Sequence, residues 1–140
     1  MRKNELTSLL DNAIKNKIDL NKLDYFGMAF IHYAALHDSL FIIAGLLSLG
    51  VKIDQANKSG TTALMIAARD GHLDIVTKLI EASATVDQVD RNGDTALMVA
   101  ARRGHLDIVA KLIEAGATVD QANKRGQTAL IRAAYDGHLD

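Results

Sequence analysis

A repeat of 33 residues fills the middle of the chain and leaves few possible architectures. The segment that opens with Thr-Ala-Leu-Met at Thr62 opens again at Thr95, and with Thr-Ala-Leu-Ile at Thr128. Residues 57–89 and 90–122 are identical at 24 of 33 positions. A fixed period of this length indicates a solenoid, because each repeat is one supersecondary unit that buries its apolar face by stacking on its neighbours.

Each regular repeat is predicted to contain two short helices and a projecting turn. The inner helix begins after a threonine N-cap and ends at Gly71 or Gly104, where glycine adopts a left-handed conformation freely. The outer helix follows over residues 73–82 and 106–115, with its apolar residues on one face. The Asn, Asp and Gly residues that come next favour a turn.

Together these residues resemble the ankyrin-repeat family. The motif is Thr-Ala-Leu-Met-x-Ala-Ala-x-x-Gly-His-Leu-Asp-Ile-Val, followed by Leu-Ile-Glu-Ala-x-Ala-Thr-Val-Asp. The family pattern usually opens with Thr-Pro-Leu-His, and here His32 occupies the position of that histidine, whereas Met65 and Met98 replace it later. The resemblance implies an all-α solenoid of stacked helix-turn-helix pairs with projecting, β-hairpin-like tips. It also implies protein recognition through the concave face and the tips.

The chain is interpreted as a single domain over residues 1–140. Its segments are an N-terminal cap helix (1–23), three full repeats (24–56, 57–89 and 90–122) and a partial repeat (123–140). The cap is expected to present one apolar helical face, made of Leu6, Leu9, Leu10, Ala13 and Ile14. In the first full repeat, Ala29 replaces the threonine N-cap and Asp38 replaces the left-handed glycine, so this repeat is expected to be looser.

The partial repeat is expected to leave one apolar face of the solenoid uncovered. Asp140 would lie in the first turn of a further outer helix, which favours a chain that continues beyond it. The alternative is a C-terminal half-cap, because Arg132 stands at a position that is aliphatic in the other repeats. An uncovered face would also favour self-association.

Composition excludes several function classes. The formal net charge of −1 gives no overall attraction to nucleic acid or to an anionic membrane. The apolar run 40–51 is too short to span a bilayer. The chain has no cysteine, and its N-terminus has no apolar secretory segment, so a cytoplasmic location is expected, or a host cytosol if the chain belongs to a secreted effector.

The repeated histidines and carboxylates do not predict a metal site, a cofactor or an enzyme. His72, His105 and His138 recur once per repeat, and equivalent positions in stacked helices lie about 8–10 Å apart. Two ligands of one zinc ion lie much closer, since a Zn–N bond is about 2 Å long. These histidines are therefore predicted to brace the turn between paired helices. No phosphate loop, nucleophile elbow or converging acid pair is present.

The positions that differ between repeats indicate where a partner binds. Charge changes at Thr61/Asp94 and at Asp70/Arg103, near the turn tip and at the end of the inner helix. Packing fixes buried positions, so exposed ones are free to adapt to a ligand. The predicted contact residues are Tyr25, Phe26, Met28, Leu36, His37, Lys58, Ser59, Thr61, Arg69, Asp70, Arg91, Asn92, Asp94, Arg102, Arg103, Lys124, Arg125, Gln127, Tyr135 and Asp136.

The expected partner is a protein with an apolar anchor for the N-terminal end of this surface and acidic groups for its basic residues. The alternative interpretation is that Tyr25 and Phe26 cover the cap while the basic residues form a solvated rim. A second hypothesis makes the chain the targeting module of a longer enzyme or secreted effector. Nucleic-acid binding is not expected, because no continuous basic stripe is interleaved with aromatic residues. No small-molecule substrate is evident.

Overall fold

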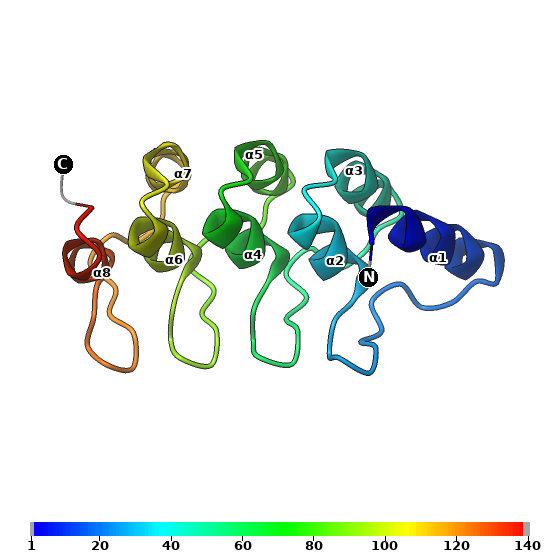
Figure 1. Cartoon of the computed structure of the whole chain (residues 1–140), viewed down its shortest axis with the longest axis horizontal. Coiled ribbons are helices and arrows are strands. Elements are labelled where there is room, and N and C mark those ends of the chain that lie inside the picture. Colours follow the sequence, from blue (N-terminus) through cyan, green and yellow to red (C-terminus); the bar gives the residue numbers. More distant parts are fainter. Residues whose placement is uncertain (1, 139–140) are drawn as a thin grey trace.

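The computed structural model describes residues 2–138, which form eight α-helices stacked in pairs, without a β-strand among them (Figure 1). The inner helices form one row and the outer helices a second row, and the turn tips project on the side of the inner row away from the outer helices (Figure 1). The inner helices are α2 (Phe30–Leu36), α4 (Ala63–Asp70), α6 (Ala96–Arg103) and α8 (Ala129–Tyr135). The outer helices are α3 (Leu40–Ser48), α5 (Leu73–Glu81) and α7 (Leu106–Glu114), and α1 (Lys3–Lys15) precedes them all.

The predicted limits of the regular helices are confirmed. The Thr62 hydroxyl accepts a hydrogen bond from the backbone N–H of Met65, and Thr95 and Thr128 cap α6 and α8 in the same way. Helix α4 ends at Gly71, whose φ of 79° lies in the left-handed region. A Cβ at this glycine would lie 2.9 Å from the imidazole of His105, so the position needs glycine for space as well as for conformation. The expected turn at Asp140 lies outside the described residues.

The core runs through the stack as one continuous cluster. Ala67 and Ala68 on α4 are fully buried, and these small side chains allow the neighbouring inner helices α2 and α6 to approach closely. From the outer helix α5, Ile75, Val76 and Leu79 are also fully buried. Because each repeat supplies one wall of its neighbour's core, the stack holds the tips and inner helices at a fixed spacing.

In the first repeat a histidine compensates for the missing threonine cap. Ala29 offers no side-chain oxygen, as expected, but its backbone N–H donates to Nδ1 of His32 at 2.9 Å. The other ring nitrogen, Nε2, donates to the carbonyl oxygen of Gln55 at 2.7 Å. The fully buried imidazole is therefore neutral, and burial lowers its pKa. Asp38 has a φ of 53°, which confirms the left-handed conformation predicted for it.

Helix α1 differs in part from its predicted arrangement. Leu6, Leu10 and Ala13 are buried, whereas Leu9 and Ile14 stay 46% and 43% exposed. Its buried residues follow an i, i+4, i+7 stripe, because α1 packs against the inner helix α2 and lies across the end of the stack (Figure 1). The prediction of an apolar face was right for three of its five residues and wrong for Leu9 and Ile14.

Candidate binding surface

Each turn tip is held by local hydrogen bonds, and two of its side chains point into solvent. In the second repeat, Oδ1 of Asn57 accepts hydrogen bonds from the backbone N–H groups of Ser59 and Thr61 at 2.9 and 3.0 Å. Asp24, Asp90 and Asn123 make the same pair of bonds in the other tips. The two residues after each of these Asn or Asp side chains are exposed in all four tips.

Hydrogen bonds between the tips join them into a single row. The backbone N–H of Lys58 donates to the carbonyl of Gly27 at 2.9 Å, and Arg91 and Lys124 make the corresponding bonds to Ser59 and Asn92 at 3.2 and 3.0 Å. The predicted tip residues therefore belong to a preformed surface, and a partner would lose little free energy in ordering it.

The N-terminal end of this row carries an exposed aromatic pair. Tyr25 is 92% exposed and Phe26 is 74% exposed, and their rings meet edge to face with centroids 5.4 Å apart. Neither ring packs into the core, so the interpretation that they cover the cap is wrong. Leu36 on the inner helix is also exposed, at 41%, whereas Met28 is half-buried. The structure thus leaves apolar side chains in solvent at this end of the row.

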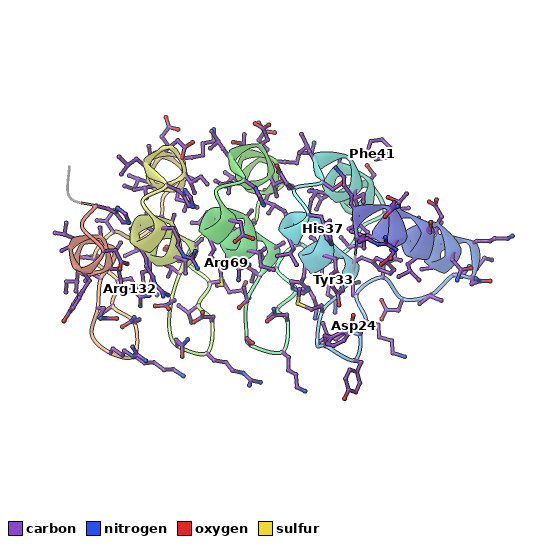
Figure 2. All side chains as sticks on the ribbon, in the orientation of Figure 1. Asp24, Tyr33, His37, Phe41, Arg69 and Arg132 are labelled. Carbon is purple, nitrogen blue, oxygen red and sulfur yellow. The ribbon has the colours of Figure 1, made fainter. Side chains whose placement is uncertain are left out.

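A small apolar cavity of about 220 Å³ lies at this end of the stack, and Asp24 of the first tip helps to line it. Its lining comes from α1, α2 and the first tip, and includes Ile18, Met28, Phe30 and Tyr33. The Tyr33 hydroxyl donates to the carboxylate of Asp24, which anchors the first tip to the inner helix (Figure 2). Burial and this hydrogen bond raise the pKa of Tyr33 to about 12. Although burial opposes it, the hydrogen bonds that Asp24 accepts lower the pKa of its carboxyl group.

The basic residues of the inner helices are not equally available. Arg69 is held by the next residue, Asp70, through two hydrogen bonds, Nε to Oδ1 at 2.8 Å and Nη2 to Oδ2 at 3.1 Å. This pairing raises the pKa of Arg69 and, against the effect of burial, lowers the pKa of Asp70. At the equivalent positions of the third repeat, Arg102 and Arg103 are both exposed. The predicted free charge at Arg69 is therefore largely neutralised, and the basic surface begins one repeat later.

Asp94 was predicted as an exposed contact residue, and this prediction is wrong. Its side chain is buried, with Oδ1 accepting a hydrogen bond from Nδ2 of Asn123 at 2.8 Å. Nη1 of Arg132 lies 3.5 Å from the same oxygen and 3.2 Å from Oε1 of Gln127. The charge change at this position thus serves packing between the third and fourth repeats. Arg132, which the sequence marked as unusual but did not place in the site, supplies the counter-charge.

Beside this buried pair is a polar cavity of about 350 Å³ on the side of the tips. Eight predicted residues line it, from the last two tips, from α6 and from the C-terminal end of α8, namely Asn92, Asp94, Arg102, Lys124, Arg125, Gln127, Tyr135 and Asp136. The structure therefore brings together predicted residues as far apart in the sequence as Asn92 and Asp136.

The repeated histidines have a structural role between repeats. Nε2 of His105 donates to the carbonyl oxygen of Arg69 in the preceding repeat at 2.9 Å. Nδ1 of His72 lies 3.7 Å from the carboxylate of Asp38, again in the preceding repeat. His72 and His105 make no side-chain capping hydrogen bond in the turn that they were predicted to brace, and their imidazoles instead contact the preceding repeat. Within residues 2–138, no group of three or more His, Asp or Glu side chains is placed to hold a metal ion.

The fold and this surface define a class, the helical solenoids that present inner helices and turn tips on one side. A family model described as ankyrin repeats in three copies matches residues 2–90 and 82–140. The chain belongs to the ankyrin-repeat family, whose members are generally non-catalytic, protein-binding modules. Among curated proteins, none matches the chain. In the part that the structure describes, no helix combines the length and apolar character needed to cross a membrane.

Proposed function

We propose that this chain recognises a protein partner through its row of turn tips and the adjoining inner helices, without catalysis of its own. One observation carries the proposal, the exposed aromatic pair Tyr25 and Phe26 at the first tip. The equivalent positions of the second repeat are Lys58 and Ser59, so the fold itself does not require aromatic residues there. Aromatic side chains are frequent interface hot spots, and leaving two of them in solvent gains nothing for the free chain.

The partner that fits this surface is asymmetric. Its apolar anchor would contact the rings of Tyr25 and Phe26, with Leu36 beside them. Its acidic groups would contact the basic residues towards the C-terminal end, and these charges would mainly set the association rate and specificity. Because Arg69 already has Asp70 as its partner, the cationic contribution is assigned to Arg91, Arg102, Arg103, Lys124 and Arg125. A cytoplasmic location, or a host cytosol, is consistent with such a role.

A pull-down with three baits tests the proposal. The baits are the native chain, the double variant Tyr25→Ser/Phe26→Ser, and a control double variant, Leu9→Ser/Ile14→Ser, which removes two exposed apolar side chains from α1. Circular dichroism first shows that all three fold alike. We expect one protein to be retained by the native and control baits, and its Kd to rise at least about 30-fold in the aromatic variant, as loss of a 2 kcal/mol hot spot predicts.

The opposite result is equally informative. If the retained protein binds the aromatic variant as tightly as it binds the native chain, the tips are not the recognition surface. If it binds the aromatic variant tightly but is lost with the control variant, recognition lies on α1 instead.

A further inference from the structure

We propose that the polar cavity between the third and fourth repeats is a carboxylate-binding pocket, which takes one acidic side chain of the protein partner. The inference rests on the proposed function, since it names a chemical feature of the partner and the place where that feature binds. The cavity has a volume of about 350 Å³ and opens on the side of the tips. This is ample room for one Asp or Glu side chain and leaves space for water.

The wall of the pocket is cationic. Arg102, Lys124, Arg125 and Arg132 contribute four positive charges to its lining, and Asp94 and Asp136 contribute two negative charges, so the lining carries a net charge of +2. The whole chain, by contrast, has a net charge of −1. The positive potential is therefore local, which favours a single anionic group over a long polyanion such as nucleic acid.

The two aspartates do not cancel this potential where a ligand would enter. Asp94 is buried in the floor, where Asn123 donates to it at 2.8 Å and Arg132 lies 3.5 Å away. Asp94 and Arg132 together carry no net charge. Asp136 faces Arg102 at 4.0 Å, which is a loose contact between half-exposed side chains. Lys124 and Arg125 are exposed and have no side-chain hydrogen bond within residues 2–138, so their donors remain free for a ligand.

The same place in the preceding junction is built differently. There the inner helix carries Arg69, which is bound to Asp70, and Val99 occupies the position that Arg132 has in α8. The cationic pocket is thus a property of the last junction and not of the repeat as such. Guanidinium and ammonium groups in one lining suit a carboxylate, because arginine can donate two parallel hydrogen bonds while lysine adds a point charge.

Nuclear magnetic resonance on the ¹⁵N-labelled full chain tests the pocket directly. The probe is N-acetylated, C-amidated triglutamate, which is about 10 Å long and cannot bridge distant repeats. Triglutamine serves as the neutral probe and inorganic phosphate as a free anion. We expect triglutamate to shift the signals of Arg102, Lys124 and Arg125 with a saturable curve, and triglutamine to leave them unchanged.

Two variants with the same change in net charge give the test its control. Lys124→Glu/Arg125→Glu replaces two positive charges of the pocket lining with negative charges and should weaken triglutamate binding at least tenfold. Lys3→Glu/Lys52→Glu changes two exposed lysines outside the tips and should weaken it less than twofold. Equal losses in both variants, or shifts spread evenly over all lysines and arginines, would mean general electrostatic attraction and overturn the proposal. Shifts produced by phosphate alone would reassign the pocket to inorganic anions.

The outcome is independent of the aromatic tip. If the partner recognises Tyr25 and Phe26 but triglutamate does not bind the pocket, the pocket assignment fails while the proposed function stands. If triglutamate binds the pocket and no partner depends on the aromatic pair, the proposed function fails while the carboxylate site stands.

Discussion

The pair formed by Asp94 and Arg132 allows a quantitative test of how neighbouring repeats fit together. Both residues depart from the repeat, since Thr61 stands at the position of Asp94 in the second repeat and Val99 at the position of Arg132 in the third. Their side chains are 9% and 12% exposed, and the charged atoms lie 3.5 Å apart. The proposed perturbation is to return each residue to the type found one repeat earlier, as Asp94→Thr, Arg132→Val and the double variant.

Each single variant should destabilise the fold, because it leaves one charge buried without its partner. Breaking a buried ion pair from one side costs about 3–5 kcal/mol. Here the cost should be about 2–3 kcal/mol, because Arg132 keeps a hydrogen bond to Gln127 and Asp94 keeps one from Asn123. The double variant recreates the Thr–Val combination of the preceding junction. It should lie within about 1 kcal/mol of the native free energy of unfolding, because apolar replacements of buried pairs are often neutral.

The assay is urea denaturation of all four proteins, followed by circular dichroism, with equal m-values required for comparison. Amide hydrogen exchange of residues 129–138 measures the local stability of α8, since the ends of a solenoid unfold more readily than its middle. The single variants together should lose about 4–6 kcal/mol and the double variant at most about 1 kcal/mol, so the expected coupling energy between the two sites is at least about 3 kcal/mol. If the losses of the single variants simply add in the double variant, the two departures are unrelated and the reasoning is wrong.

Two further predictions concern residues of the first and second repeats. The free energy of unfolding should fall as the pH drops below about 6.5, because burial lowers the pKa of His32 in the folded state and a protonated Nδ1 would face the N–H donor of Ala29. The urea midpoints at pH 7.5 and 5.0 should therefore differ more in the native chain than in His32→Met. An equal difference in both proteins would contradict this prediction. Gly45→Ala should stabilise the chain by about 0.5–1 kcal/mol, because Gly45 lies within α3 and no atom lies within 4 Å of an added Cβ. Gly71→Ala should destabilise the chain by more than that, because Gly71 has a φ of 79° and an added Cβ would meet His105. Thermal unfolding of the two glycine variants tests the contrast, and a loss of stability in Gly45→Ala would show that the glycine is required there.

The fold was predictable because its determinants are local and repeated. The threonine caps and Gly71 define the helix limits from a few adjacent residues, and the period then places every later copy. The N-terminal helix was less predictable, because its apolar residues mark a helical face but do not give the orientation in which the helix packs. Its packing against α2 exposes Leu9, whereas Ile42 at the equivalent position of the outer helix α3 is buried.

The binding surface was predictable in its composition but not in the pairing of its charges. The list of tip residues follows from the repeat, and four exposed tip pairs confirm that these positions face solvent. The bond between Arg69 and Asp70 joins sequence neighbours and could have been anticipated. The pair of Asp94 and Arg132 is harder, because it joins residues 38 positions apart. The sequence did offer one signal for it: Asp94 and Arg132 both depart from the repeat, have opposite charges and lie in adjacent repeats.

That signal has a wider consequence for a protein built of nearly identical units. Repeats that share 24 of 33 residues have almost the same cores, so hydrophobic packing alone discriminates weakly between the correct order and a slipped or exchanged one. The position of Asp94 changes its chemistry from one repeat to the next, and so does the position of Arg132, which lies 38 residues later. The equivalent residues are Met28 and Ile66 at the first junction and Thr61 and Val99 at the second, where the third has the ion pair of Asp94 and Arg132. An aspartate placed against an aliphatic partner, or an arginine placed against methionine, would leave a buried charge unpaired and cost several kcal/mol. The buried pair of Asp94 and Arg132 therefore favours the observed stacking over a slipped one, and Arg132 also lines the cationic pocket.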